Sequence, residues 1–344
     1  MLLSVLDQSP VSSGSSAADA IRQTVELARL VERLGYHRFW LAEHHGAAGL
    51  AGSAPEVLAA AVAAATTTLR VGSGGVLLSH YSALKVAEAF RVLEVLYPGR
   101  IDLGVGRASG ATELAGAALR SGPEAFGDEH FSRRLAELVG FVTGALPPDH
   151  PFAGVAAVPA GPTAPEVWLL GSSSDSADRA AALGLPLCFG HFITPTYGPQ
   201  VVARYRQRFR PSARLDRPLA TVAVSVVCAD TDRDADRLAL PGRVWRLDPQ
   251  PLRRPVPSAE EAAGRDLTPL EAARLDQGRA KAIVGGPERV RSRLLGLAAE
   301  FDVDELLVVT VCHGTEAKVR SYELLAEAFG LSPPSARLSN VTEE

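Results

Sequence analysis

Eight short runs of apolar residues alternate with helical patterns along this chain of 344 residues. Two of the runs read LATVAVSVVCA and ELLVVTVC, with almost no polar side chain. Parallel strands that helices cover have this near-continuous apolar character. Strict alternation of strands and helices therefore predicts a parallel α/β fold. We expect strands at residues 2–6, 38–42, 69–78, 100–105, 167–170, 186–192, 219–229 and 305–312.

The segments between these strands have the apolar spacing of amphipathic helices. The helix predicted at residues 17–34 is expected to begin after Ser16, with Asp19 in its first turn. A second N-terminal signal, the sequence SAPE at residues 53–56, has the form of a capping box. Further helices are expected at residues 82–96, in the region up to about 145, and at 175–183, 199–209, 287–300 and 315–329.

Two parallel architectures fit this order, a doubly wound sheet and a (β/α)8 TIM barrel. A doubly wound dinucleotide-binding sheet should carry G-x-G-x-x-G directly after its first strand, where this chain reads DQSP. We therefore predict a single TIM barrel at residues 1–333, within the size range of a fold that takes about 250 residues or more. Residues 241–278, which are rich in proline, form a long insertion between strands seven and eight and are expected to be a lid. Residues 334–344 are expected to be a flexible tail.

Charge and hydropathy exclude several classes of partner. The chain has 35 basic and 39 acidic residues, a net charge of −4 and no basic tract, so nothing indicates binding to nucleic acid or to a membrane surface. The longest apolar stretch, residues 57–65, is about half of the roughly 18 residues that suggest a membrane span. The N-terminus lacks a signal-peptide pattern, and Cys188, Cys228 and Cys312 are expected to be reduced core thiols. These features predict a cytoplasmic protein.

In a TIM barrel the catalytic groups lie at the C-terminal ends of the strands. Strand two ends in Glu43-His44-His45, and a histidine there could act as an acid or a base near neutral pH. The alternative is a solvated loop. No metal site is predicted, because adjacent side chains on an extended segment point apart and no further ligand cluster lies nearby in the sequence.

Strands three and four are rich in glycine near their ends, with Gly74 and Gly75 in the first and Gly106 in the second. Glycine inside a strand usually marks the close approach of a ligand or of another backbone. Two adjacent strand ends without side chains therefore suggest a flat bound group. Tight turns in the barrel are the alternative explanation.

The fifth strand runs into Ser172-Ser173-Ser174 and then directly into a helix. Hydroxyl groups, free N–H groups and the positive end of a helix suit a phosphate, and the cationic Arg107 follows the neighbouring strand. Simple capping of the helix by Ser174 would also explain the run. His191 and His313 close strands six and eight and are expected to be capping residues or to lie behind the site.

Taken in order, these segments resemble the bacterial luciferase-like family of flavin-dependent monooxygenases. The resemblance covers most of the chain and rests on LDQSPV, FWLAEHH, SAPEVL, RVGSGGVLL, KVAEAFRVLEVLYPGRIDLGVGRASG, VWLLGSSSDSA, VGGPERV and DELLVVTVCH. It implies a TIM barrel that binds FMN at the strand C-termini, uses reduced flavin and oxygen through a peroxyflavin, and forms a homodimer. It also implies a two-component system, in which a separate flavin reductase supplies reduced FMN.

The resemblance also implies roles for single residues. His44 matches the functional histidine of the family, and Gly74 and Gly75 fall where some members have a cis peptide beneath the flavin. Arg107 and the serines at 172–174 match phosphate contacts. Gly106 stands where the luciferase subunit has a cysteine beside the flavin.

Two departures from the family pattern concern the substrate and the flavin edge. Ser79 and His80 stand where close relatives commonly have Pro and Asn, and Ser109 replaces a proline. Glu43, His45, His80, His191 and His313 are further candidates for substrate contact or for supporting the site.

Two other functions stay open from the sequence. One is a deazaflavin-dependent hydride-transfer oxidoreductase of the same barrel superfamily. The other is a flavin-binding protein without turnover. The apolar residues at the barrel mouth would suit many small organic substrates alike.

Overall fold

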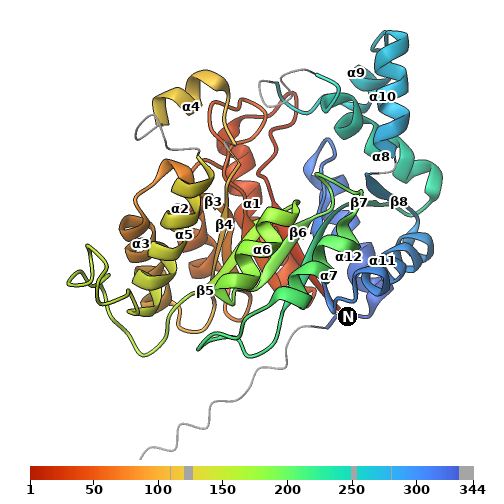
Figure 1. Ribbon diagram of the computed structural model, residues 1–344. Coiled ribbons are helices and arrows are strands. Elements are labelled where there is room, and N and C mark those ends of the chain that lie inside the picture. The colour runs from red at the N-terminus through yellow and green to blue at the C-terminus, as the bar shows by residue number, and fades with distance from the viewer. Residues whose placement is uncertain (109, 120–126, 249–253, 280, 333–344) are drawn as a thin grey trace, which may run out of the picture.

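The computed structural model describes residues 1–108, 110–119, 127–248, 254–279 and 281–332. Within these residues nine parallel strands form one sheet, and eight of them close into a barrel with helices around it (Figure 1). The strands are β1 (Leu2–Asp7), β2 (Arg38–Leu41), β3 (Arg70–Leu77), β4 (Ile101–Gly106), β5 (Glu166–Gly171), β6 (Leu187–Gly190), β7 (Ala220–Cys228), β8 (Ala282–Gly285) and β9 (Glu305–Val309). The predicted TIM barrel is confirmed.

The barrel closes in the order β1 to β7, then β9, and β9 pairs again with β1. Strand β8 is extra. It bonds to the C-terminal half of β7, with Ala282 opposite Ser225, beyond the end of β6, where Gly190 pairs with Ala223. The eighth predicted strand is thus β9, and β8 was not predicted.

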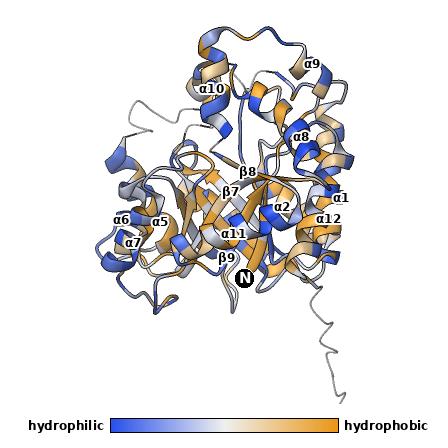
Figure 2. Ribbon diagram, turned by 90° about the vertical axis from the view of Figure 1, so that its right-hand side faces the viewer, coloured by the Kyte–Doolittle hydropathy of each residue, from blue (hydrophilic) through white to orange (hydrophobic). Residues whose placement is uncertain are grey.

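Helices surround the barrel or lie at the C-terminal end of its strands. They are α1 (Ala17–Arg33), α2 (Pro55–Ala65), α3 (Ala83–Leu96), α4 (Glu113–Leu119), α5 (Asp128–Thr143), α6 (Ser174–Leu183), α7 (Gly198–Arg208), α8 (Asp232–Trp245), α9 (Ala259–Ala263), α10 (Pro269–Arg279), α11 (Pro287–Phe301) and α12 (Thr315–Phe329), with a 3₁₀ turn at Leu78–His80. Figure 2 shows hydrophobic residues concentrated on the strands and hydrophilic residues on the outer faces of the helices.

Local signals set the helix ends. Ser16 caps α1 through a capping box with Asp19, as the sequence predicts. The capping box predicted at residues 53–56 is wrong. Helix α2 begins at Pro55 with Ala54 before it and no side-chain cap, because proline at the first position, with no N–H to satisfy, starts the helix itself.

The N-terminal half of the barrel interior is filled by buried aromatic and charged side chains. Arg38 donates to Asp102 at 2.8 Å and to Glu305 at 2.7 Å. The Trp40 and Trp168 rings meet edge to face at 5.3 Å, and the Arg38 guanidinium lies 4.8 Å from the Trp168 ring centre. Oppositely charged groups that are buried together satisfy one another. This layer closes the barrel below the C-terminal ends of the strands.

The insertion predicted at residues 241–278 begins inside α8 and continues through α9 and α10; residues 249–253 lie outside the described part. Val256 is fully buried and exchanges backbone hydrogen bonds with the loop after β1, at Val11 and Ser13. Helix α10, in contrast, buries none of its residues. Figure 1 shows α4 and α10 at the end of the molecule opposite the N-terminus, which is the C-terminal end of the strands.

Two further findings concern the whole of the described chain. The three cysteines are free and buried, as predicted. No helix in the described ranges is both long enough and apolar enough to cross a membrane. The tail predicted at residues 334–344 lies outside the described residues.

Candidate active site

A cavity of about 520 Å³, here called the mouth cavity, opens at the C-terminal ends of the strands. The sequence-predicted residues that line it are Glu43, His44, Gly74, Gly75, Gly106, Arg107, Ser172 and Ser173. Residues that the sequence analysis did not single out complete the wall, among them Leu6, Leu170, Ser176, Phe192 and Ile193. The structure therefore brings the candidates from strands two to five into one space.

His44 follows β2 and forms part of the cavity wall. Its backbone N–H donates to the Gly52 carbonyl at 2.8 Å, which fixes the loop. Within the described residues its buried Nδ1 has no hydrogen-bond partner. Burial of the ring, and then the neighbouring His45, lower the pKa of His44 to about 4. At neutral pH the ring is therefore uncharged and offers one donor and one acceptor.

Glu43 joins the end of β2 to the end of β3. One carboxylate oxygen accepts from His45 Nε2 at 2.6 Å and from the Tyr81 hydroxyl at 2.7 Å. The other accepts from the Leu77 N–H at 2.9 Å. The His45 ring meets the His80 ring edge to face at 5.8 Å. His45 and His80 thus lie behind Glu43 rather than in the cavity wall.

Tyr81 was not predicted as part of the site, because nothing in the sequence connects it to Glu43. Burial and the Glu43 carboxylate raise the pKa of its hydroxyl. Tyr81 therefore stays protonated and remains a donor to Glu43 across the ordinary pH range.

The three predicted glycines differ in what surrounds them. The Gly74–Gly75 peptide bond is cis. A Cβ on Gly74 would lie 2.5 Å from the Leu6 side chain, and one on Gly75 would lie 2.7 Å from the Gly104 carbonyl oxygen. Both positions therefore require glycine, because neighbouring parts of the protein lie too close for a side chain. A Cβ on Gly106 would meet nothing within 4 Å, so here the missing side chain leaves space for a ligand.

The far end of the mouth cavity is polar. Ser173 is the N-cap of α6, and its hydroxyl accepts from the Ser176 N–H at 3.4 Å. Ser172 and Ser176 line the cavity beside it, whereas Ser174 lies in the first turn of the helix. Capping is thus done by Ser173 and not by Ser174. The helix N-terminus directs N–H groups and the positive end of its dipole toward this region.

Arg107 lies between this helix and α5. It forms an ion pair with Asp128, the first residue of α5. Arg179 of α6 donates to the same carboxylate at 3.2 Å and to the Ser132 hydroxyl at 3.0 Å. A phosphate at this end would meet the Arg107 guanidinium but would compete with Asp128 for it.

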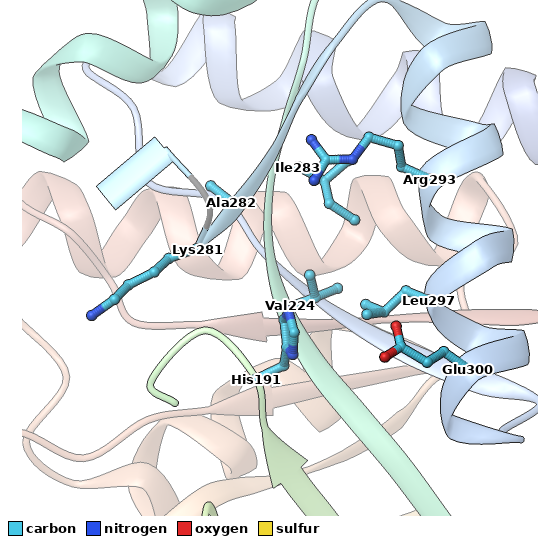
Figure 3. Close-up of a pocket in the computed structure, with 8 residues that line it drawn as sticks. All are labelled: His191, Val224, Lys281, Ala282, Ile283, Arg293, Leu297 and Glu300. Atoms are coloured by element: carbon cyan, nitrogen blue, oxygen red, sulfur yellow. The ribbon is translucent and has the colours of Figure 1, made fainter. Parts of the chain in front are cut away.

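Two predicted histidines lie elsewhere. His191 lines a separate cavity on the outside of the barrel wall (Figure 3). His313 lies within hydrogen-bond distance of the Ser13 carbonyl, 3.1 Å from Nε2, and so holds the loop after β1. In the described residues no three His, Cys, Asp or Glu side chains group as metal ligands.

These residues fit a flavin mononucleotide. The cavity has the size of a cofactor pocket, an apolar wall for a ring system, open space at Gly106, and a cation beside a helix N-terminus for a phosphate. The same features would accept other ring-bearing phosphates.

The chain belongs to the luciferase-like monooxygenase family, whose model matches residues 1–305. It is 47% identical over 328 residues to the uncharacterized protein YceB of Bacillus subtilis, covering 95% of this chain and 99% of that protein. It is 36% identical over 331 residues to the N-acetyl-S-alkylcysteine monooxygenase of the same organism, covering 95% and 97% of the two chains.

Two solved structures show the same fold. Apo-MsnO8 is 42% identical, with a TM-score of 0.86 over 97% of this chain and 99% of that chain. The oxygenating constituent of 3,6-diketocamphane monooxygenase from Pseudomonas putida, in complex with FMN, is 19% identical, with a TM-score of 0.68 over 97% and 98%.

Proposed function

We propose that this chain is an FMN-dependent monooxygenase that uses reduced FMN and molecular oxygen to oxygenate a small organic substrate. The observation that carries the proposal is the mouth cavity, which joins an apolar wall and a neutral histidine to a phosphate-suited end. Family membership supports an oxygenase. The FMN complex of a monooxygenase with this fold supports the cofactor, and the monooxygenase relative supports a small organic substrate.

In this proposal Arg107 and the start of α6 would hold the phosphate, and Gly106 and the apolar wall would accommodate the ring. Bound reduced FMN would supply the electrons that activate oxygen. Leu6, Leu170 and Phe192 would form the apolar wall beside the ring and reduce its contact with bulk water.

His44 acts on protons in this proposal. Its Nδ1 has no partner in the described protein, so this atom is available to hydrogen-bond with a ligand or substrate. Glu43 and Tyr81 fix the segment that carries it. The His44 ring is therefore held in place before a substrate binds, which suits a proton donor or acceptor.

Reduced FMN is proposed to come from a separate flavin reductase. The sequence has no G-x-G-x-x-G motif after a strand that would bind a nicotinamide cofactor. On this ground we propose that the barrel receives reduced flavin by diffusion.

The test supplies the protein with FMN, NADH and a flavin reductase, and measures oxygen uptake, product and hydrogen peroxide over a panel of small thioethers, ketones and aldehydes. At least one substrate should raise oxygen uptake with matching product. His44→Asn should keep its affinity for FMN, lose about 10² to 10⁴-fold in product formation and release peroxide instead. His313→Asn, outside the mouth cavity, is the matched control and should keep wild-type turnover.

The proposed role of His44 fails if His44→Asn retains coupled turnover. The proposed function fails if the wild-type protein binds no FMN, or if it binds FMN and forms product with none of these substrates.

A further inference from the structure

A second cavity, of about 210 Å³, lies on the outer side of the barrel wall (Figure 3). We call it the wall cavity; Val224, Ala282 and Ile283 form its strand side. It lies where β6 ends along β7 and β8 begins. Val224 stands between the Ala223 position that pairs with β6 and the Ser225 position that pairs with β8.

The wall cavity is separate from the mouth cavity. Side chains of successive strand residues point to opposite faces of a sheet. Ala223 lines the mouth cavity, and Val224 lines the wall cavity. At the end of β6, Gly190 and Phe192 line the mouth cavity, whereas His191, in the turn that follows the strand, lines the wall cavity. A ligand outside would therefore touch the same short stretch of wall that the proposed flavin site uses inside.

Helix α11 covers the wall cavity with one ordered face. Arg293, Leu297 and Glu300 are spaced four and three residues apart, so they share a side of the helix. Figure 3 shows all three side chains directed from α11 toward the strands, with Leu297 between the two charges. Seven residues at 1.5 Å each separate the two charged positions by about 10 Å along the helix axis. The face thus presents a cation, an apolar surface and an anion in line.

The two charges have no partners of their own. In the part of the chain that the structure describes, neither Arg293 nor Glu300 forms an ion pair or a side-chain hydrogen bond. Lys281, the other cation of the lining, extends away from them in Figure 3. Both groups are therefore free to bind a ligand.

His191 adds a polar atom that lacks a partner. Its buried Nδ1 has no hydrogen-bond partner among the described residues. The ring meets Phe301 edge to face at 5.7 Å. Burial lowers the pKa of His191, against the attraction of Glu300, so the ring is neutral at pH 7. A buried polar atom without a partner favours a ligand that brings a donor to it.

We propose that the wall cavity binds a small ω-amino carboxylate, a zwitterion with charged ends on an aliphatic chain. The carboxylate pairs with Arg293, the methylenes lie on Leu297 and Ile283, and the ammonium donates to Glu300 and His191 Nδ1. A plain anion would be repelled by Glu300, and a plain cation by Arg293. The zwitterion satisfies both ends and the apolar middle.

Isothermal titration of the protein without flavin tests this, with 6-aminohexanoate, hexanoate and hexylamine as probes at low ionic strength. 6-Aminohexanoate should bind about tenfold more tightly than either single-charge analogue. Arg293→Gln should weaken the binding of 6-aminohexanoate and hexanoate, and it should bind hexylamine at least as tightly as wild type because a repelling charge is removed. Glu300→Gln should weaken the binding of 6-aminohexanoate and hexylamine, and it should bind hexanoate at least as tightly as wild type for the same reason.

Arg291→Gln is the matched control, because Arg291 lies on the same helix beside Phe329 and away from the cavity. The proposal is overturned if 6-aminohexanoate gives no saturable heat, if hexanoate binds as tightly, or if the control variant loses as much affinity. Flavin takes no part in the titration, so the result is independent of the proposed monooxygenase activity.

Discussion

At the scale of single residues, the neutral state of His44 decides what this side chain can do. Its pKa of about 4 follows mainly from burial, so the free protein holds an uncharged imidazole at pH 7. An anion placed beside the ring would raise this pKa, because a nearby negative charge favours the protonated form. His44 can therefore take up a proton when an anionic ligand arrives and give it up when that charge is lost.

The lowered pKa predicts how stability depends on pH. Between pH 6.5 and about 4 the unfolded chain protonates His44 and the folded chain does not, so acid favours unfolding. The stability that depends on neutral His44 is present above pH 6.5 and is lost as the pH falls toward 4. The loss should reach about 3 kcal/mol in the free energy of unfolding.

Urea unfolding of wild type and His44→Asn across this pH range measures the effect. The free energy of unfolding of wild type relative to that of His44→Asn should decline steadily from pH 6.5 to pH 4. Parallel curves over the whole range would show that His44 titrates normally in the folded protein.

Sequence reasoning could find the residues at strand ends but not what lies behind them. His44, Arg107, Ser172 and Ser173 line the mouth cavity because the ends of parallel barrel strands meet at one face. Tyr81 contacts Glu43 across the fold, and no local pattern encodes such a contact. His191 was predicted to close a strand, but β6 ends at Gly190, and His191 lies in the turn after it and lines the wall cavity instead.

At the scale of elements, the segment from α8 to α10 differs most from the sequence prediction. Helix α8 forms despite Pro241, because Ala235 and Ala239 pack with Val284 in a small core of their own. Strand β8 is as short as β2 and β6, which were predicted, but it lies outside the closed barrel and pairs only with β7. The eight strands of the barrel could be predicted from their alternation with helices, whereas this extra strand depends on tertiary packing.

We expect the part of this segment around α10 to be the lid. Val256 fixes the segment to the loop after β1, whereas α10 buries none of its residues and stands at the mouth end. A helix with few packing contacts opens easily and can close over a bound ligand. Trypsin should cut after Arg274 or Arg279 readily in the free protein and several-fold more slowly with FMN and substrate bound.

The fragments can be identified by mass spectrometry, with the sites on α11 as internal control because that helix is packed on the barrel. Equal cleavage rates with and without ligands would remove α10 from any lid.

At the scale of the whole molecule, the barrel has two chemically distinct halves. The half near the strand N-termini is filled by the Arg38 cluster and the tryptophan pair. The other half holds the mouth cavity. The stable part and the reactive part are therefore separated along the barrel axis.

The outer surface suggests self-association. Val92, Val95 and Leu96 are exposed on one face of α3, and Val57 is exposed on the neighbouring α2. Exposed apolar side chains that gather on one face favour a protein interface. We expect a homodimer, with a light-scattering mass twice the 36.2 kDa of the chain.

Val95→Asp should shift this mass toward that of the monomer. Leu295→Asp, at an exposed position on α11, is the matched control and should leave it unchanged. A wild-type mass of 36.2 kDa would contradict the dimer.

The central claim is that the mouth cavity holds FMN with its phosphate between Arg107 and the start of α6. Fluorescence titrations with FMN and with riboflavin, which lacks the phosphate, test it most directly in wild type, Arg107→Ala and the exposed control Arg133→Ala. Wild type and control should prefer FMN. Arg107→Ala should lose one to two decades of FMN affinity, since a charge-assisted contact contributes about 1.5 to 3 kcal/mol, and should keep its affinity for riboflavin. An FMN curve unchanged by Arg107→Ala, or equal affinity of wild type for both flavins, would contradict the account.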